Sequence, residues 1–418
     1  MKFFHVADLH FGKMLYNVQL VENDQPAWVE EFLKAVDRYQ PEAVVMSGDI
    51  YDRRIPSPEA MKLFGHLLTE LARRDKYVFV IPGNHDSDIR LSHVNELLSS
   101  RRIYIAGELE KELMHVSVTD GDRKVYFWLM PFVFPKLVSD PRVLNDPEIS
   151  TYDEAARALL AAQELDPEAC NILVAHQNVL ANGVAAEHSA SESIVGGLGE
   201  IDVSAFDGFD YVALGHIHNE QPVGRETVRY AGCPLYYDFS ELERCKDLTL
   251  VTVNGKNNIS VEKVAIPLLH TLKQVSGSLE EILEEGEKIP NKNRYYIQAV
   301  LRDRHVPPRA MEQLQAVFGR SLVNVKREYL PSEEEIALGK NHAETAGLSI
   351  DAQFAGFYQE TQGELLDSDQ EELILKILEQ QIRRGDVFAS DAKAVPADDT
   401  DELIRMLLDR TEESHETA

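Results

Sequence analysis

The amino-acid sequence predicts a layered α/β fold in which buried strands alternate with helices. The first observation is a series of short apolar runs, rich in Val, Ile and Tyr, that each stop at a cluster of polar residues. The second is that segments with apolar residues at helical spacing lie between these runs. Since α/β sheets collect their ligand sites at the carboxyl ends of strands, the polar clusters mark the expected position of a functional site.

Five apolar runs support the strand prediction. Each consists of four or five mostly apolar residues, followed at once by more polar side chains than a simple turn requires. The runs are FFHV before Asp8 and His10, AVVM before SGDIYD, YVFVI before PGNHD, NILVA before His176, and YVAL before GHIH.

Two segments between the first three runs support the helix prediction. In both, apolar residues recur at spacings of three and four, which places them on one face of a helix. The first is PAWVEEFLKAVDRY, residues 26–39, with Trp28, Phe32, Val36 and Tyr39 on the apolar face. The second is SPEAMKLFGHLLTELARR, residues 57–74, with Met61, Phe64, Leu67, Leu68 and Leu71 on that face.

The composition describes a large and strongly acidic chain. Its 418 residues are enough for two or three domains, and 44% of them are hydrophobic, which allows a substantial core. The formal net charge is −29, from 42 Lys and Arg against 71 Asp and Glu. An acidic chain disfavours unaided binding to nucleic acid, because polyanion affinity rests on cationic phosphate contacts. Any nucleic-acid substrate therefore needs local help from bound cations, a basic patch or a partner subunit.

No segment of the sequence predicts membrane insertion. No run reaches the roughly 18 to 20 apolar residues of a membrane span, and the opening MKFFHVADLH turns polar too early for a signal peptide. We therefore expect a cytoplasmic location and no membrane contact. The three cysteines, Cys170, Cys233 and Cys245, form no CxxC pair, so we expect reduced thiols and neither disulfides nor a thiolate zinc site.

The polar clusters together predict a two-metal site. Asp8 and His10 project to the same side of an extended chain, so both can reach one ion. Asp49 follows a glycine that permits close approach, and its carboxylate can bridge two cations about 3.5 to 4 Å apart. The remaining expected ligands are the amide oxygen of Asn84 and the imidazoles of His176, His216 and His218.

This ligand set predicts the chemistry of the site. It mixes oxygen and nitrogen without sulfur, which suits Mn²⁺, Fe²⁺ or Zn²⁺ better than Ca²⁺. Two such cations favour hydrolysis of a phosphate ester, because one activates water while both neutralise the phosphoryl oxygens. His85 is expected beside the metals, where it contacts the scissile phosphate or protonates the leaving oxygen. Asp86 either orients or charges His85, or caps the following turn.

Each motif alone also has a purely structural explanation. A single DxH or GDxxD arises often by chance, and Asx residues after Pro and Gly are ordinary turn formers. A lone histidine such as His176 is usually a core residue with a satisfied hydrogen bond. Asn84, His85 and Asp86 in succession are nevertheless a poor choice for a turn. The order of all five clusters, each at a strand end, therefore favours the metal site.

The same motifs resemble those of a known family. In their order, DxH, GDxxD, GNHD, a later single His and GHxH are similar to the calcineurin-like metallophosphoesterases. More narrowly, the chain resembles the SbcD family, the nuclease subunits of bacterial double-strand-break repair complexes, over nearly its whole length. The segments that carry this resemblance are HVADLHFGK, SGDIYDRRIPSPEA, IPGNHDS, GFDYVALGHIHNEQPVG, VRYAGCPLYYDFSE and VKREYLP. The resemblance implies a sandwich of two sheets flanked by helices, with a small α/β capping domain and C-terminal helices.

The resemblance also implies a role for each site residue. It implies two divalent metal ions, with Mn²⁺ as the expected metal, and His85 as the catalytic histidine with Asp86 beside it. One ion is assigned to Asp8, His10, Asp49 and His218, and the other to Asp49, Asn84, His176 and His216. The chain departs from the family pattern at positions that are not expected ligands. Cys233 and Asp238 stand where serine is expected, and His176 follows alanine where glycine is commoner.

By the same resemblance the chain divides into four parts. They are a nuclease domain at 1–268, a capping domain at 269–335, a helical partner-binding segment at 336–384 and a flexible acidic tail at 385–418. In the capping domain, basic side chains either contact DNA phosphates or form an ordinary solvated surface. These side chains are Arg302, Arg304, Arg309, Arg320, Lys326 and Arg327.

The third part of the chain predicts a protein partner. In the family this segment binds the base of the coiled coil of an SbcC-type ATPase; the alternative is that it packs back on its own capping domain. The resemblance further implies a homodimer within the complex, and double-stranded and hairpin DNA as substrates. The apolar residues at helical spacing are Phe354, Phe357, Tyr358, Leu373, Ile374, Ile377, Leu378 and Ile382.

Three hypotheses for function follow. The first is a two-metal-dependent DNA nuclease, a double-strand exonuclease and hairpin or single-strand endonuclease, that works with an ATPase in DNA end processing, repair and recombination. The second is a stand-alone metallophosphodiesterase or phosphatase of a small molecule, which would have little use for C-terminal helices with apolar faces. The third is a non-catalytic scaffold with a decayed metal site. All seven expected ligands and His85 are intact, which argues against the third hypothesis.

Overall fold

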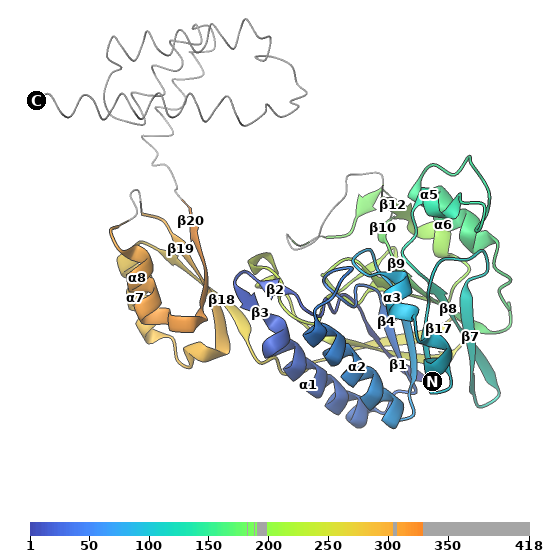
Figure 1. Ribbon diagram of the computed structural model, residues 1–418, viewed down its shortest axis with the longest axis horizontal. Coiled ribbons are helices and arrows are strands. Elements are labelled where there is room, and N and C mark those ends of the chain that lie inside the picture. Colours follow the sequence, from blue (N-terminus) through green and yellow to red (C-terminus); the bar gives the residue numbers. More distant parts are fainter. Residues whose placement is uncertain (182, 188, 190–198, 304–306, 329–418) are drawn as a thin grey trace, which may run out of the picture. The chain divides into compact units, whose positions relative to one another are not determined.

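Two six-stranded sheets form the centre of the structure, a computed structural model that describes residues 1–181, 183–187, 189, 199–303 and 307–328 (Figure 1). The first sheet has the order β17 (Asn258–Val264), β16 (Leu248–Gly255), β1 (Lys2–Val6), β4 (Ala43–Ser47), β5 (Tyr77–Ile81) and β6 (Ile103–Ile105). The second has the order β14 (Gln221–Val223), β15 (Arg225–Tyr230), β13 (Tyr211–Gly215), β9 (Cys170–His176), β8 (Arg123–Met130) and β7 (Met114–Asp120). The expected partner-binding segment, the acidic tail and Arg304 lie outside the described residues.

The central strands of each sheet run parallel. In the first sheet β1 pairs with β4 and β4 with β5, so that Ser47 lies opposite Ile81. In the second sheet β9 pairs with β13, and His176 lies opposite Gly215. Parallel neighbours end at the same edge of a sheet, so the polar residues that follow these strands are brought together. All five apolar runs are confirmed as strands.

The sheets pack face to face around a core of aromatic and branched side chains. Phe79 of the first sheet stacks on Phe127 of the second with ring centroids 4.2 Å apart, and Phe3 contacts Phe127 edge-on. Both faces of β4 and β9 are buried, which explains why these strands read as continuous apolar runs. The layered arrangement with outer helices confirms the predicted α/β sandwich.

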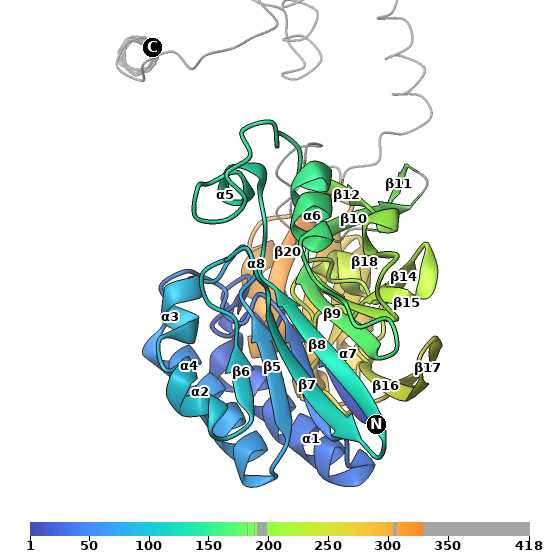
Figure 2. The same ribbon diagram turned by 90° about the vertical axis from the view of Figure 1, so that its right-hand side faces the viewer.

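Helices cover the outer faces of both sheets. On the first sheet lie α1 (Asp24–Tyr39) and α2 (Pro58–Arg73), and Figure 2 shows α2 and α4 (Asn95–Ser99) beside β5 and β6. Ser57 caps α2 by accepting a hydrogen bond from the Ala60 N–H, with Pro58 in the first turn. Met61, expected on the apolar face of α2, is instead 51% exposed. The buried face of this helix consists of Ala60, Phe64, Leu67, Leu68 and Leu71, and Met61 lies outside it. On the second sheet lies α6 (Tyr152–Ala161), which begins with a capping box.

A smaller α/β unit follows the sandwich. Its parallel sheet contains β18 (Thr271–Gly277), β19 (Tyr295–Leu301) and β20 (Leu322–Arg327), and α7 (Leu279–Lys288) and α8 (Ala310–Phe318) pack against one face. The small α/β unit that the resemblance implies for this part of the chain is present in the structure. Asp24 at the start of α1 joins the two units, because its carboxylate accepts the Tyr296 hydroxyl hydrogen bond and contacts His270 Nδ1 at 2.8 Å.

Shorter elements complete the described residues. They are β2 (Met14–Leu15), β3 (Val18–Gln19), α3 (Asp88–Ser92), α5 (Pro135–Val138), β10 (Asn178–Ala181), β11 (Val184–Ala185), β12 (Glu200–Asp202) and the 3₁₀ helices η1 (Leu20–Glu22), η2 (Val203–Phe206), η3 (Phe239–Glu241), η4 (Lys292–Arg294) and η5 (Gly319–Ser321). All three cysteines are free, and the long and apolar helix that a bilayer span would need does not occur among the residues described. The cytoplasmic location and the four-part domain division stay predictions.

The core between the sheets yields a stability prediction. Phe127→Ala removes a fully buried ring that contacts Phe3 and Phe79, so the free energy of unfolding should fall by about 3–5 kcal/mol. Met61→Ala, on the exposed side of α2, is the matched control and should change it by less than about 0.5 kcal/mol. Urea titration followed by circular dichroism measures both. Equal losses for the two variants would contradict the assignment of Phe127 to the central core.

Candidate metal centre

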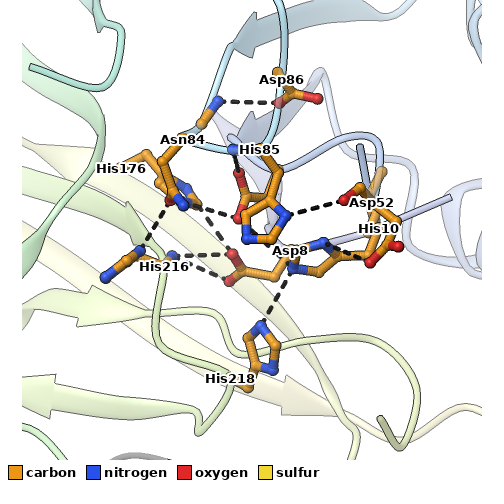
Figure 3. Close-up of polar contacts among 12 residues, drawn as sticks. Asp8, His10, Asp52, Asn84, His85, Asp86, His176, His216 and His218 are labelled. Atoms are coloured by element: carbon orange, nitrogen blue, oxygen red, sulfur yellow. Dashed lines mark hydrogen bonds and ion pairs between the residues drawn. The ribbon is translucent and has the colours of Figure 1, made fainter. Parts of the chain in front are cut away.

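The expected site residues converge at the edge where the parallel strands of both sheets end (Figure 3). The loops after β1, β4 and β5 of the first sheet contribute four of the expected ligands, and the ends of β9 and β13 of the second sheet contribute three. In chain order these ligands are Asp8, His10, Asp49, Asn84, His176, His216 and His218. The site is therefore assembled from side chains that are far apart in the sequence and belong to two sheets.

The loops reach this geometry through unusual backbone conformations. Asp8, His10 and Asp49 have φ values of 53°, 41° and 48°, and His216 has a φ of 105°. Left-handed conformations of non-glycine residues cost on the order of 1–3 kcal/mol each and persist only where the surrounding structure imposes them. Such conformations turn the chain sharply at the strand ends. Four of the twelve non-glycine residues with positive φ in the described part of the chain are thus expected ligands.

Two glycines make room for the neighbouring side chains. Gly48 has a φ of 85°, and a Cβ atom there would overlap the His176 imidazole. A Cβ atom at Gly83 would overlap the carboxylate and backbone of Asp49. The predicted close approach at the glycine before Asp49 is confirmed, and a second close approach occurs beside Asn84.

The first ligand group consists of Asp8, His10 and His218. Each offers one ligand atom, and these atoms lie within 4.8 Å of one another. His10 Nε2 is 3.2 Å from His218 Nε2 and 3.6 Å from Asp49 Oδ2. All four side chains are buried. The structure thus brings together every residue of the first expected metal set.

The second ligand group surrounds Asn84 Oδ1. His176 Nε2 lies 3.1 Å from this oxygen and 3.4 Å from Asp49 Oδ2. His216 Nδ1 lies 3.2 Å from the same Asn84 oxygen. His176 Nδ1, on the far side of the ring, is 2.8 Å from the Ser47 carbonyl oxygen. This contact holds the imidazole with Nε2 toward the other expected ligands, so the second metal set is also assembled.

The two groups fit divalent cations. Neighbouring ligands of a six-coordinate cation with bonds of about 2.1 Å lie roughly 3 Å apart, close to the 3.1 to 3.6 Å separations found in both groups. The donors are carboxylate, amide and imidazole atoms, which suit Mn²⁺, Fe²⁺ or Zn²⁺. The cluster of ligand atoms therefore fits divalent metal ions.

The buried carboxylates of the site, Asp8 and Asp49, need a positive charge close by. Burial raises the pKa of Asp8 to about 7. Burial alone would also raise the pKa of Asp49, but His176 and His10 hold it well below its usual value. Burial would lower the pKa of His176, yet Asp49 and Asp8 raise it to about 9. A proton on His176 therefore balances the carboxylates where a metal cation is expected.

The Asp86 carboxylate contacts the backbone of two loops. Its carboxylate accepts hydrogen bonds from the backbone N–H groups of Ile50, Tyr51 and Gly83, at 3.0, 2.9 and 3.0 Å. These bonds tie the loop after β4 to the loop after β5. The hydrogen bonds of Asp86 go to these backbone groups and not to the His85 ring, so orientation of His85 by Asp86 stays a prediction without a direct contact among the described residues. The alternative role, capping of the following turn, does not match these contacts either, because Ser87 accepts the Arg90 N–H at the start of α3.

The orientation of His85 comes from other groups. Its backbone N–H donates to Asp49 Oδ1 at 2.9 Å, and its Nδ1 lies 2.9 Å from the Asp52 carbonyl oxygen. His10, Asp52 and His85 also have ligand atoms within 4.8 Å of one another, but Asp52 is held by the Lys13 ammonium at 3.1 Å. With Nδ1 engaged, Nε2 is the nitrogen of His85 that remains for a substrate.

Sequence analysis missed several residues that contact the expected ligands. Glu241 is fully buried with Oε1 3.6 Å from His218 Nδ1. The Tyr237 hydroxyl donates to the carbonyl of Leu9 at 2.7 Å, and its ring packs edge-on against both His10 and His218. The segment AGCPLYYDFSE, which contains both residues, contributed to the resemblance without a role for either. Phe132 was not identified, although its ring centroid lies 6.3 Å from those of two expected ligands, His176 and His216.

Comparison with known families finds two matches. Residues 1–220 match the calcineurin-like phosphoesterase family, and residues 269–362 match the type 5 capsule protein repressor C-terminal domain. The first match covers more than half of the chain and contains all seven expected ligands. The second begins next to the predicted boundary of the capping domain.

Individual proteins are also similar to the chain. It is 31% identical over 301 residues to the SbcD component of the nuclease SbcCD of Staphylococcus epidermidis, covering 71% of this chain and 78% of that protein. Among solved structures, a dimetal phosphatase from Danio rerio is 12% identical, covers 64% of this chain and 98% of its own, and has a TM-score of 0.38. The Thermus thermophilus protein TT1561 is 11% identical, covers 63% and 98%, and has a TM-score of 0.37.

The pKa values of the metal-free site predict proton-linked metal binding. His176 is protonated below about pH 9 and Asp8 below about pH 7, and both must lose this proton to bind a cation. The apparent affinity for Mn²⁺ should therefore rise with pH between about 6 and 9, with net proton release. Isothermal titration calorimetry in buffers of different ionisation enthalpy measures that release. Uptake of protons, or an affinity independent of pH over this range, would contradict the prediction.

Proposed function

Because this chain belongs to the calcineurin-like phosphoesterases and, within them, to the SbcD family, we propose that it is the two-metal-dependent nuclease subunit of a DNA-processing complex. The proposed partner is an SbcC-type ATPase, and the proposed role is DNA end processing, repair and recombination. The proposed reactions are exonucleolytic cleavage of double-stranded DNA and endonucleolytic cleavage of hairpins and single strands. The proposed cations are two Mn²⁺ ions.

One observation carries the metal assignment: a single oxygen of Asp49 faces both ligand groups. Oδ2 lies 3.4 Å from His176 Nε2 and 3.6 Å from His10 Nε2, while Oδ1 accepts the backbone N–H of His85. An oxygen shared between two groups is what a bridging ligand requires. We assign one ion to Asp8, His10, Asp49 and His218 and the other to Asp49, Asn84, His176 and His216.

The chain's own residues bind and orient the reacting groups. Two bound cations would supply charge neutralisation at the phosphoryl oxygens and a lowered pKa for the attacking water. The imidazole of His85 is held by Asp52 through Nδ1, so Nε2 is free to gain a proton and pass it to the leaving oxygen. His85 thereby acts on the substrate without being assigned as a ligand.

The charge of the chain supports a role for the partner. With a net charge of −29, the chain supplies little counterion release on its own, so the ATPase is proposed to provide most of the DNA affinity. Within the described residues, Arg309, Arg320, Lys326 and Arg327 of the capping unit remain proposed phosphate contacts. Arg302 is paired with Glu328 at 3.2 Å, which weakens its assignment to this set.

A pair of variants tests the catalytic assignment. His85→Ala should keep two Mn²⁺ ions per chain and reduce hydrolysis by about 10²- to 10⁴-fold, because it removes a proton donor without removing a ligand. Asp49→Ala is the comparison and should lose both metal and activity, because it removes the bridging carboxylate. Metal content by elemental analysis and the rate of aryl phosphodiester hydrolysis give the two readouts. Loss of metal from His85→Ala would make His85 a ligand.

Truncation separates chemistry from partner binding. A chain that ends near residue 345 retains all expected ligands and should hydrolyse a small phosphodiester at the full-length rate. It should no longer co-purify with the ATPase, because it lacks the apolar positions at 354–382, which at about 1.5–3 kcal/mol per large side chain are enough for a stable helix contact. Loss of ATP-stimulated cleavage of linear and hairpin DNA should accompany this.

The same assays distinguish the competing functions. A full-length chain that hydrolyses the small phosphodiester, yet leaves DNA intact with and without the ATPase, would favour a stand-alone phosphodiesterase. Undiminished ATPase binding by the truncated chain would remove the docking assignment. Tight DNA binding by the isolated chain that persists at high salt would contradict the proposed division of DNA affinity.

A further inference from the structure

A buried ion pair lies directly behind one of the expected metal ligands. Glu241, at the end of η3, is fully buried, and its Oε2 accepts hydrogen bonds from Lys246 Nζ at 2.8 Å and from the Tyr237 backbone N–H at 3.1 Å. Its other oxygen, Oε1, lies 3.6 Å from Nδ1 of His218. The opposite nitrogen of that ring, Nε2, faces His10 Nε2 at 3.2 Å. Glu241 therefore lies on the far side of the imidazole from the expected cation.

The ion pair with Lys246 keeps Glu241 in the form that accepts hydrogen bonds. Burial alone would raise the pKa of Glu241, but His218 and Lys246 hold it well below its usual value. Burial alone would lower the pKa of Lys246, but Cys233 and Glu241 raise it. Three donors, Lys246 Nζ, the Tyr237 N–H and Cys233 Sγ, contact Oε2 of Glu241. Its other oxygen, Oε1, is turned toward the His218 ring.

The cluster is not arranged as a third cation site. His218, Cys233 and Glu241 have ligand atoms within 4.8 Å of one another, which alone would suit a metal. The Lys246 ammonium, however, lies 3.0 Å from Cys233 Sγ and 2.8 Å from Glu241 Oε2. A buried ammonium group already supplies the positive charge that these ligands would attract.

We propose that Glu241, paired with Lys246, is a positioning residue that fixes the His218 imidazole with its proton on Nδ1 and its Nε2 lone pair toward the metal site. A histidine that binds a cation through Nε2 must carry its proton on Nδ1, and an acceptor at Nδ1 selects that tautomer and the ring orientation. The inference rests on the proposed two-metal function. It extends that function to a residue that contacts neither substrate nor cation.

The two expected metal sites differ in the group that lies behind the histidine ring. His176, an expected ligand of the second ion only, has Nδ1 against the neutral Ser47 carbonyl at 2.8 Å. A carboxylate behind an imidazole makes the ring a more basic ligand than a carbonyl does. Loss of Glu241 should therefore weaken the site that contains His218 and leave the site that contains His176 unchanged.

The test replaces the ion pair without leaving a buried charge. In Glu241→Gln combined with Lys246→Met, the Tyr237 N–H still needs an acceptor, which keeps the glutamine carbonyl in the place of Oε2. The amide NH₂ then faces His218 Nδ1 and offers a donor where an acceptor was, which disfavours the required tautomer. Two Mn²⁺ ions should still bind, one with unchanged affinity and one weakened by about 10- to 100-fold, as measured by calorimetry.

Two control variants separate positioning from stability. Asp210→Asn alters another buried carboxylate, which accepts the Asn171 backbone N–H at 2.8 Å and contacts Lys256 but no described histidine. It should lower the melting temperature of the metal-free chain without changing either metal affinity. Cys233→Ser places at this position the residue expected there and should leave both affinities unchanged.

A spectroscopic readout follows the tautomer itself. In ¹⁵N-histidine-labelled metal-free protein, the two-bond proton–nitrogen correlations of His218 should report a proton on Nδ1 in the parent chain. The proton should move to Nε2 in the Glu241→Gln, Lys246→Met variant. Unchanged affinity at both sites in the folded double variant, or equal weakening of both sites, would overturn the proposal while leaving the two-metal function intact. A parent chain that binds no divalent cation would instead overturn the proposed function.

Discussion

The structure depends on one constraint, which is that two carboxylates are buried at the meeting edge of two sheets. Asp8 and Asp49 are nearly inaccessible to water, and isolated buried carboxylates are among the most costly groups to bury in a protein. Four histidines, an amide and the backbone N–H groups of His216 and His85 surround them. Asp49 and Asp8 in turn raise the pKa of His176 to about 9. The unusual backbone angles, the close glycines and the parallel strand ends all serve to bring these groups together.

Much of this arrangement could be predicted, because strand ends leave a clear signal in sequence. The apolar runs are buried on both faces, so they read without interruption, and the chemically useful residues follow immediately. Asp8, Asn84 and His216 lie at the strand ends where they were expected, although it was the order of all five clusters, and no single motif, that pointed to a metal site. The α/β character of the capping unit was expected from the family resemblance, and the structure has it.

Other features carry no sequence signal. His85 is oriented by the backbone carbonyl of Asp52, and a carbonyl is present in every residue, so nothing in the sequence favoured it over the neighbouring Asp86 side chain. Glu241 reaches His218 through a short 3₁₀ turn, and contacts between distant loops do not follow from spacing. Met61 shows a third limit, since periodicity gives the direction of an apolar face but not its width.

Each expected metal set draws its ligands from both sheets, with His218 in one set and His176 and His216 in the other coming from the second sheet. Slippage of one sheet along the other by a single residue would move these histidines about 3.3 Å relative to the aspartates, more than the length of a metal–ligand bond. The aromatic contacts between the sheets therefore keep the expected ligands of the two sheets in register with one another. A change in that core that leaves the chain folded but lets the sheets shift would separate the expected ligands, so the geometry of the site depends on side chains deep in the hydrophobic interior.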